Sequence, residues 1–242
     1  MRVLFTIQYL GTRYAGWQSQ QNAVGVQDVL ESVLEKLFGA RTRIEGAGRT
    51  DAGVHASAQK AHCDVPFAIP LRGLVLGMND LLPHDIRVLA VEEIAADFHC
   101  RFRAKRKRYA YRIWNDEVMD VFRWQTHAHT RQPLDESLMR EATAGLTGKH
   151  DFRAFTVAEP EVSSTERTIT ALELERSGRE ITIRLTADGY LRFMVRRIAG
   201  SLIEIGRGKM ETDALRRSLE PAFEAARWTA PARGLTLEEI EY

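Results

Sequence analysis

The order of hydrophobic periodicities along the first 93 residues is the feature that most constrains the fold. Residues 2–10 alternate between apolar and polar, which predicts a half-buried strand. From 26 to 38, apolar residues recur every three or four positions, as in an amphipathic helix that Gly39 can end. The same reasoning predicts strands over 41–45, 56–65 and 86–93 and a helix over 71–82. This part of the chain therefore reads strand, helix, strand, strand, helix, strand.

That order is typical of ferredoxin-like and RNA-recognition-type folds, in which helices cover one face of an antiparallel sheet. The rest of the chain partly repeats it. Strands are predicted over 108–114, 168–176, 180–187 and 235–242, and helices over 134–146, over 191–205 and from Thr212. We therefore expect an α+β protein of two such α/β halves, 1–97 and 98–242. They would share a mostly antiparallel sheet, with an active-site cleft between them. The polar segment 156–166 is predicted to be a mobile loop.

Positive charge is concentrated in one short stretch. The chain has 34 Lys and Arg against 33 Asp and Glu, a net charge of +1, so its overall charge does not predict a polyanionic partner. Residues 101–112 nevertheless hold seven basic side chains and no acidic one. Phe102, Tyr109 and Tyr111 lie among them, and aromatic rings beside basic groups suit unpaired RNA bases and their phosphates. The alternative is an edge strand whose charges prevent aggregation.

The loop GAGRTDAGVHA, residues 46–56, places three glycines around Asp51. Its glycine spacing does not match a dinucleotide-binding fingerprint, and the chain has no Walker A motif. Asp51 either caps backbone amides in a turn or acts as a nucleophile or general base, with Arg49 close enough to keep it ionised. A single carboxylate does not make a typical glycosidase, which needs a pair. His55 closes the loop and is a candidate for ligand contact.

Two Cys residues, each following a His, are too few for a disulfide framework. The pairs are His62-Cys63 and His99-Cys100, and a His-Cys pair that occurs twice is not a metal-ligand spacing, so we expect buried structural cysteines. His127 and His129 alternate as in a strand and are interpreted as surface or packing residues.

No apolar run approaches the length of a membrane helix, and we expect a cytoplasmic protein.

Six segments, in the same order and over essentially the whole chain, resemble the TruA-type tRNA pseudouridine synthases, also called pseudouridine synthase I. They are YLGTRYAGWQSQ (9–20), GRTDAGVHA (48–56), FHCRFRAKRKRYAYRI (98–113), GKHDFRAF (148–155), MVRRIAGSLIEIGRGK (194–209) and APARGLTLEEIEY (230–242). Gly48 and Cys100 stand where the family often has Ala, and these departures leave the catalytic positions intact.

The resemblance implies an isomerase that converts uridine to pseudouridine at positions 38, 39 and 40 of the tRNA anticodon stem-loop. It implies that Asp51 is the catalytic nucleophile, that Tyr109 stacks on the target uracil, and that Arg196 pairs with Asp51. Arg49 would help to flip the base or hold the RNA. A homodimer with no metal or other cofactor is also implied. The further candidates for RNA contact are Arg106, Lys107, Arg108 and His55.

Chemical reasoning agrees with these roles, because the reaction exchanges an N1 bond for a C5 bond without redox change or hydrolysis. One carboxylate suffices if it attacks the ribose C1′ or the uracil C6, and the sequence leaves that choice open. Two alternatives remain. A non-catalytic RNA-binding or tRNA-chaperone module would use the same basic and aromatic residues but would not need an ionised aspartate. A carboxylate-based nucleoside hydrolase lacks support because no aspartate cluster for a metal is present.

Overall fold

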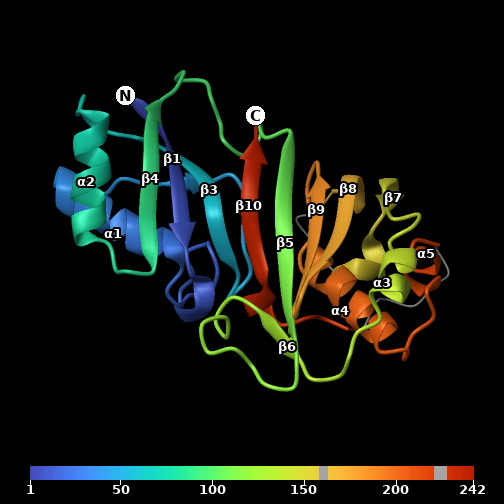
Figure 1. Ribbon diagram of the computed structural model, residues 1–242. Coiled ribbons are helices and arrows are strands. Elements are labelled where there is room, and N and C mark those ends of the chain that lie inside the picture. The colour runs from blue at the N-terminus through green and yellow to red at the C-terminus, as the bar shows by residue number, and fades with distance from the viewer. Residues whose placement is uncertain (158–162, 221–227) are drawn as a thin grey trace. The chain divides into compact units, whose positions relative to one another are not determined.

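The computed structural model describes residues 1–157, 163–220 and 228–242 (Figure 1). The chain forms two compact units: unit 1 comprises residues 1–105 and 237–242, and unit 2 comprises residues 106–236. Both units combine helices with mostly antiparallel strands, which confirms the predicted α+β class. The domain division after residue 97 stays a prediction. Within the described residues, no helix is both long and apolar enough to cross a membrane.

Unit 1 is built on a sheet with the strand order β4-β1-β3-β10, and β2 pairs with β3. Strand β1 is antiparallel to both of its neighbours. Helix α2 packs against β4 and against α1 (Figure 1). The elements are β1 (Arg2–Tyr9), the 3₁₀ helix η1 (Gly11–Arg13), α1 (Val26–Phe38), β2 (Glu45–Gly46), β3 (His55–Asp64), α2 (Leu71–Leu81), β4 (Ile86–Glu93) and β10 (Leu235–Glu241).

The core of unit 1 follows the predicted periodicities. Val3, Phe5 and Ile7 of β1 are fully buried, and so are Val26 and Leu30 of α1. Burying a side chain of this size stabilises the folded state by about 1.5–3 kcal/mol. The same burial fixes the register of β1, because a shift by one residue would turn its apolar side chains toward solvent.

The strand predicted over 41–45 is wrong in extent, since only Glu45 and Gly46 join the sheet. Helix α1 supplies the reason. The amide of Ile44 donates to Glu31 Oε1 at 3.1 Å, and Gln27 Nε2 donates to the Ile44 carbonyl at 3.1 Å. Helix side chains thus satisfy the backbone groups of Ile44 that a longer strand would have used.

Unit 2 has the strand order β5-β9-β8-β7, and the short β6 lies parallel to the end of β5. Helix α3 packs against α4 and α5. The elements are β5 (Arg106–Asn115), β6 (Ala128–Thr130), α3 (Glu136–Ala142), β7 (Gly148–Asp151), η2 (Arg153–Phe155), β8 (Glu166–Ser177), β9 (Glu180–Ala187), α4 (Met194–Gly206), α5 (Ala214–Arg217) and η3 (Ala232–Gly234).

The sequence predicted the long strands of unit 2 and missed its short ones. Strands β5, β8 and β9 are confirmed, whereas β6 and β7, of three and four residues, are too short to show a periodicity. Helix α4 begins at Met194, later than predicted, because Phe193 adopts a left-handed conformation with φ of 63°. Of the loop predicted to be mobile, residues 158–162 lie outside the described residues, and Glu166 already begins β8.

Candidate active site

Asp51 lies in a tight turn between β2 and β3, in the segment 47–54 that we call the Asp51 loop. The amide of Val54 donates to the Asp51 carbonyl at 3.1 Å and closes the turn. Gly53, inside the turn, has φ of 79°, a conformation that favours glycine. Asp51 is half-buried, while Arg49 on the same loop is exposed.

Residues 9–17 brace the Asp51 loop on both sides of the aspartate. On one side, the amide of Trp17 donates to the Thr50 carbonyl at 3.1 Å, and the Tyr9 and Thr50 hydroxyls share a buried hydrogen bond of 2.8 Å. On the other side, the amide of Gly53 donates to the Tyr14 carbonyl at 3.2 Å. The backbone that carries Asp51 is therefore fixed by a segment about 35–40 residues earlier in the chain.

Two glycines permit this close approach. A Cβ at Gly11 would lie 1.9 Å from the carbonyl oxygen of Val54, and a Cβ at Gly16 would lie 2.4 Å from that of Thr50. Both distances are far below van der Waals contact, so only glycine fits. Reasoning from residue types alone missed this brace, although both segments belong to the family resemblance.

His55 adds a further contact to residues 9–17. Its side chain is buried, and its Nδ1 accepts a hydrogen bond from the amide of Gly11 at 2.9 Å. This contact holds His55, the first residue of β3, against Gly11 in the segment that follows β1. The predicted contact of His55 with RNA stays a prediction.

Tyr109 lies on β5 of unit 2, where it is 7% exposed. Its ring meets that of Tyr190 edge to face, with centroids 5.0 Å apart and an interplanar angle of 86°. Tyr190 is in turn anchored, because its hydroxyl donates to the Leu185 carbonyl at 2.7 Å. Burial raises the pKa of Tyr190 well above its usual value, so this phenol remains a hydrogen-bond donor at neutral pH. Tyr190 thus positions Tyr109, a role that the sequence analysis missed.

Arg196 lies in the first turn of α4 and is anchored within unit 2. Its Nε donates to the Ala230 carbonyl at 2.9 Å, and the Ala230 amide donates back to the Arg196 carbonyl at 3.0 Å. The guanidinium carbon lies 5.2 Å from the centre of the Phe193 ring. One turn further on, a Cβ at Gly200 would lie 2.3 Å from the Trp228 carbonyl oxygen. The absence of a side chain at Gly200 therefore leaves room for the chain's own backbone.

The basic run 101–112 is divided between the two units. Residues 101–105 belong to unit 1, and 106–112 belong to β5 of unit 2. Because strand side chains alternate, Arg106 and Arg108 lie on one face of β5, whereas Lys107 and Tyr109 lie on the other. Arg106 and Arg108 are exposed and Lys107 is half-buried. The three predicted RNA contacts therefore do not all share a face with Tyr109.

Comparison with known proteins identifies the family. The sequence model described as tRNA pseudouridine synthase matches residues 6–103 and 142–242, more than half of the chain. The chain belongs to the tRNA pseudouridine synthase family. The predicted family membership is therefore confirmed, and with it the prediction of an isomerase.

Curated members of the tRNA pseudouridine synthase family match over nearly their full length. The chain is 42% identical to tRNA pseudouridine synthase A of Myxococcus xanthus, covering 100% of this chain and 92% of the relative. It is 43% identical to tRNA pseudouridine synthase A of Moorella thermoacetica, covering 98% of each. Among solved structures, a chain from the crystal structure of a Cbf5-Nop10-Gar1 complex is 11% identical with a TM-score of 0.38. That match covers 98% of this chain and 49% of the other.

Proposed function

We propose that this tRNA pseudouridine synthase modifies uridines 38, 39 and 40 of the anticodon stem-loop, with Asp51 as the nucleophile. In the reaction the uracil N1–C1′ bond breaks, a C5–C1′ bond forms, and the proton on C5 is lost as N1 gains one. The observation that carries the proposal is the brace around Asp51. A carboxylate that must attack one atom of a flipped nucleotide needs a backbone that does not move.

The other proposed roles follow from side-chain chemistry. Tyr109, held by Tyr190, offers a fixed ring on which an extruded uracil can stack, and stacking offsets part of the few kcal/mol that base flipping costs. Arg196 is proposed to pair with the Asp51 carboxylate and keep it anionic, and Arg49 to contact the RNA backbone. The further proposed RNA contacts are Arg106, Lys107, Arg108 and His55.

The test of the nucleophile is to replace Asp51 by Asn or Ala and measure pseudouridine in tRNA made in vitro. We expect pseudouridine formation to be abolished while tRNA binding persists, because the backbone of the loop is held by contacts that the side chain does not make. Asp64→Asn is the matched control: this exposed carboxylate lies in the same unit and pairs with Arg2. Pseudouridine formation by the Asp51 variants would contradict Asp51 as the nucleophile. A wild-type protein that binds tRNA but forms no pseudouridine would instead be a non-catalytic RNA-binding module.

The proposed positions and assembly need separate measurements. Mass spectrometry or carbodiimide mapping of tRNA from a strain lacking the gene should show pseudouridine lost from positions 38, 39 and 40 and restored by the gene. Loss elsewhere in the tRNA would contradict the anticodon stem-loop assignment. We further propose a cytoplasmic homodimer whose chemistry uses no cofactor, and sedimentation of the purified protein should give twice the mass of the chain.

A further inference from the structure

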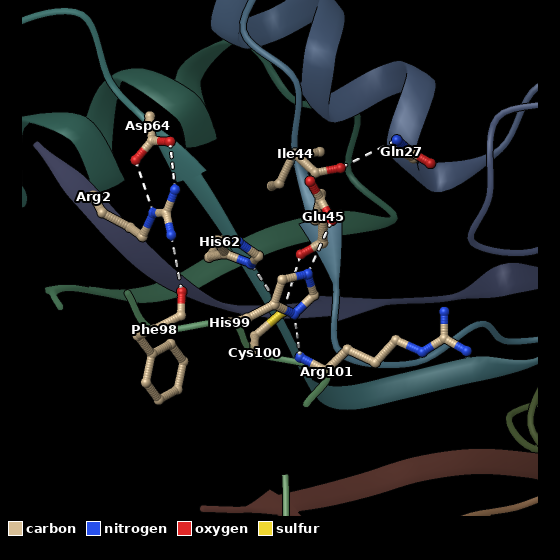
Figure 2. A network of polar contacts seen from close by, with 10 residues as sticks. All are labelled: Arg2, Gln27, Ile44, Glu45, His62, Asp64, Phe98, His99, Cys100 and Arg101. Atoms are coloured by element: carbon tan, nitrogen blue, oxygen red, sulfur yellow. Dashed lines mark hydrogen bonds and ion pairs between the residues drawn. The ribbon is translucent and has the colours of Figure 1, made fainter. Parts of the chain in front are cut away.

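A cluster of metal-ligand side chains lies in unit 1, outside the residues proposed for catalysis. Figure 2 shows His62, His99, Cys100 and Glu45 pointing toward one another. The three ligand atoms offered by His62, His99 and Cys100 all lie within 4.8 Å of one another. Among the described residues, no other group of His, Cys, Asp and Glu gathers in this way.

The fold brings these residues together from three separate segments. Glu45 of β2 lies directly opposite His62 of β3 in the antiparallel pairing. His99 and Cys100 come from the turn that follows β4. Arg2 ties that turn to the sheet, because its guanidinium donates to the Phe98 carbonyl at 3.2 Å and to both carboxylate oxygens of Asp64 at 2.8 and 2.7 Å. The ligands are thus held in place by contacts in which they take no part.

Two of the distances between ligand atoms are close to those of a tetrahedral site. His62 Nδ1 and Cys100 Sγ are 3.1 Å apart, and His99 Nε2 is 3.2 Å from Glu45 Oε2. With zinc bonds of about 2.0–2.3 Å, neighbouring ligand atoms in a tetrahedron lie about 3.3–3.8 Å apart. The ligand atoms of His62, His99 and Cys100 all lie within 4.8 Å of one another, so movements of about 1 Å would bring these three to the tetrahedral separations. Glu45 lies outside this group of three and needs its own change of rotamer to become the fourth ligand.

Burial and ligand type select the kind of metal. The His62 and Cys100 residues are 5% and 0% exposed, while the side chains of His99 and Glu45 are 30% and 53% exposed. The first pair would form a dry inner wall, and the second would let an ion enter. Two imidazoles with one thiolate suit zinc and not magnesium or calcium, which prefer oxygen ligands.

We propose that His62, His99, Cys100 and Glu45 bind one zinc ion and form a structural site that ties β2, β3 and the turn at 98–103 together. On binding, the Cys100 thiol loses its proton to solvent and a zinc–sulfur bond replaces the hydrogen bond from Sγ to the Glu45 carbonyl. The hydrogen bond from the Arg101 amide to His99 Nδ1 at 3.2 Å must also break. If His99 binds zinc through Nδ1, the lone pair that accepts this hydrogen bond is used for the metal. If His99 binds through Nε2, Nδ1 carries the proton and can no longer accept. The zinc takes no part in the proposed isomerisation.

The test is to titrate the purified, chelator-treated full chain with cobalt and then with zinc. We expect one equivalent of cobalt to give a thiolate-to-cobalt charge-transfer band, zinc to remove the band, and zinc to raise the melting temperature. Cys100→Ser should abolish the band. Zinc affinity should fall by more than the roughly 10- to 100-fold that results from losing a hydrogen-bond partner of a ligand.

Cys63→Ser is the matched control, because Cys63 is the chain's other buried cysteine and also follows a histidine. This variant should keep both the band and the affinity. A wild-type chain that gives no band, or a Cys100→Ser chain that keeps it, overturns the proposal. If Cys100→Ser does not fold, His99→Gln, at the more exposed side, must weaken zinc binding instead. None of these measurements depends on pseudouridine formation, so a negative result for zinc would not contradict the proposed function, and the reverse also holds.

Discussion

Gly11 has no room for a side chain, because a Cβ there would lie 1.9 Å from the carbonyl oxygen of Val54, the last residue of the Asp51 loop. We expect Gly11→Ala to destabilise the protein by about 1–3 kcal/mol, the usual effect of overpacking, and to reduce pseudouridine formation as the loop shifts. Thermal unfolding and turnover on tRNA measure the two effects.

The matched control for Gly11→Ala is Gly73→Ala, in helix α2. The nearest atom to a Cβ at Gly73 is 3.9 Å away, and alanine is the better helix former. This variant should be more stable by about 0.5–1 kcal/mol and fully active. If Gly11→Ala were as stable and as active as Gly73→Ala, the Asp51 loop could move away from Gly11 at little energetic cost.

Tyr109 permits a test of stacking that is separate from the tyrosine hydroxyl. Base–aromatic stacking contributes about 1–3 kcal/mol, so Tyr109→Leu should reduce kcat/KM by about 5- to 150-fold. Tyr109→Phe keeps the ring and should retain most of the binding of tRNA. An equal loss of kcat/KM in Tyr109→Leu and Tyr109→Phe would contradict a stacking role for the Tyr109 ring. The measurement is kcat/KM on a transcript of the anticodon stem-loop.

At this scale the sequence singled out the residues proposed for catalysis but not the residues that support them. Asp51 stood out by its glycines, while the roles of Tyr109 and Arg196 came from the resemblance to a family. Tyr190 and the pairing of Gly11 with His55 were not found. These contacts join residues 81 and 44 positions apart, and no local pattern records which residues a fold brings together.

Among the elements, Asp151 joins the end of β7 to η2 and to the residue before β8. It accepts hydrogen bonds from Arg153 Nε at 2.7 Å, from the Arg153 amide at 3.0 Å and from the Thr165 hydroxyl at 2.6 Å. Mainly through the bonds from the Arg153 side chain, the pKa of Asp151 falls to about 2.

A folded-state pKa below the unfolded value of about 3.9 means that Asp151 stabilises the fold fully above about pH 4 and loses that effect as the pH falls toward 2. We expect Asp151→Asn to lower the melting temperature at neutral pH and to approach the wild type near pH 2. Melting curves of both proteins from about pH 2 to pH 7 measure this difference. A difference that did not change with pH would mean that the carboxylate acts only through packing.

Elements were predictable where their periodicity was long. Helix α1 and strand β4 have the predicted bounds. The exception at 41–45 arose from competition, because Gln27 and Glu31 of α1 satisfy the backbone of Ile44. His127 and His129 were interpreted as surface or packing residues. His127, just before β6, is buried, and its Nε2 lies 3.1 Å from Glu180 Oε2. His129 lies in β6, and its Nε2 donates to the Asp116 carbonyl.

For the whole molecule, a net charge of +1 is compatible with an RNA substrate because the positive charge is local. We expect Arg106→Gln to weaken tRNA binding and to reduce the slope of log affinity against log salt by about 0.7–0.9, the value for one phosphate contact. Arg216→Gln is the control, since this exposed arginine lies on helix α5, outside the basic run 101–112. Binding titrations at several salt concentrations measure the slope. An unchanged slope for Arg106→Gln would remove β5 from the RNA-binding surface.

The last strand, β10, has a consequence for synthesis on the ribosome. It pairs with β3, and the Lys105 amide donates to the Glu241 carbonyl at 2.8 Å, yet β10 follows the whole of unit 2 in the chain. Domains usually fold as they emerge during translation. Unit 1, which carries Asp51, must instead wait with an unpaired strand edge until all of unit 2 has been made. A nascent chain therefore cannot complete the unit that carries Asp51, and the edge of β3 that β10 later covers is where a chaperone would be needed.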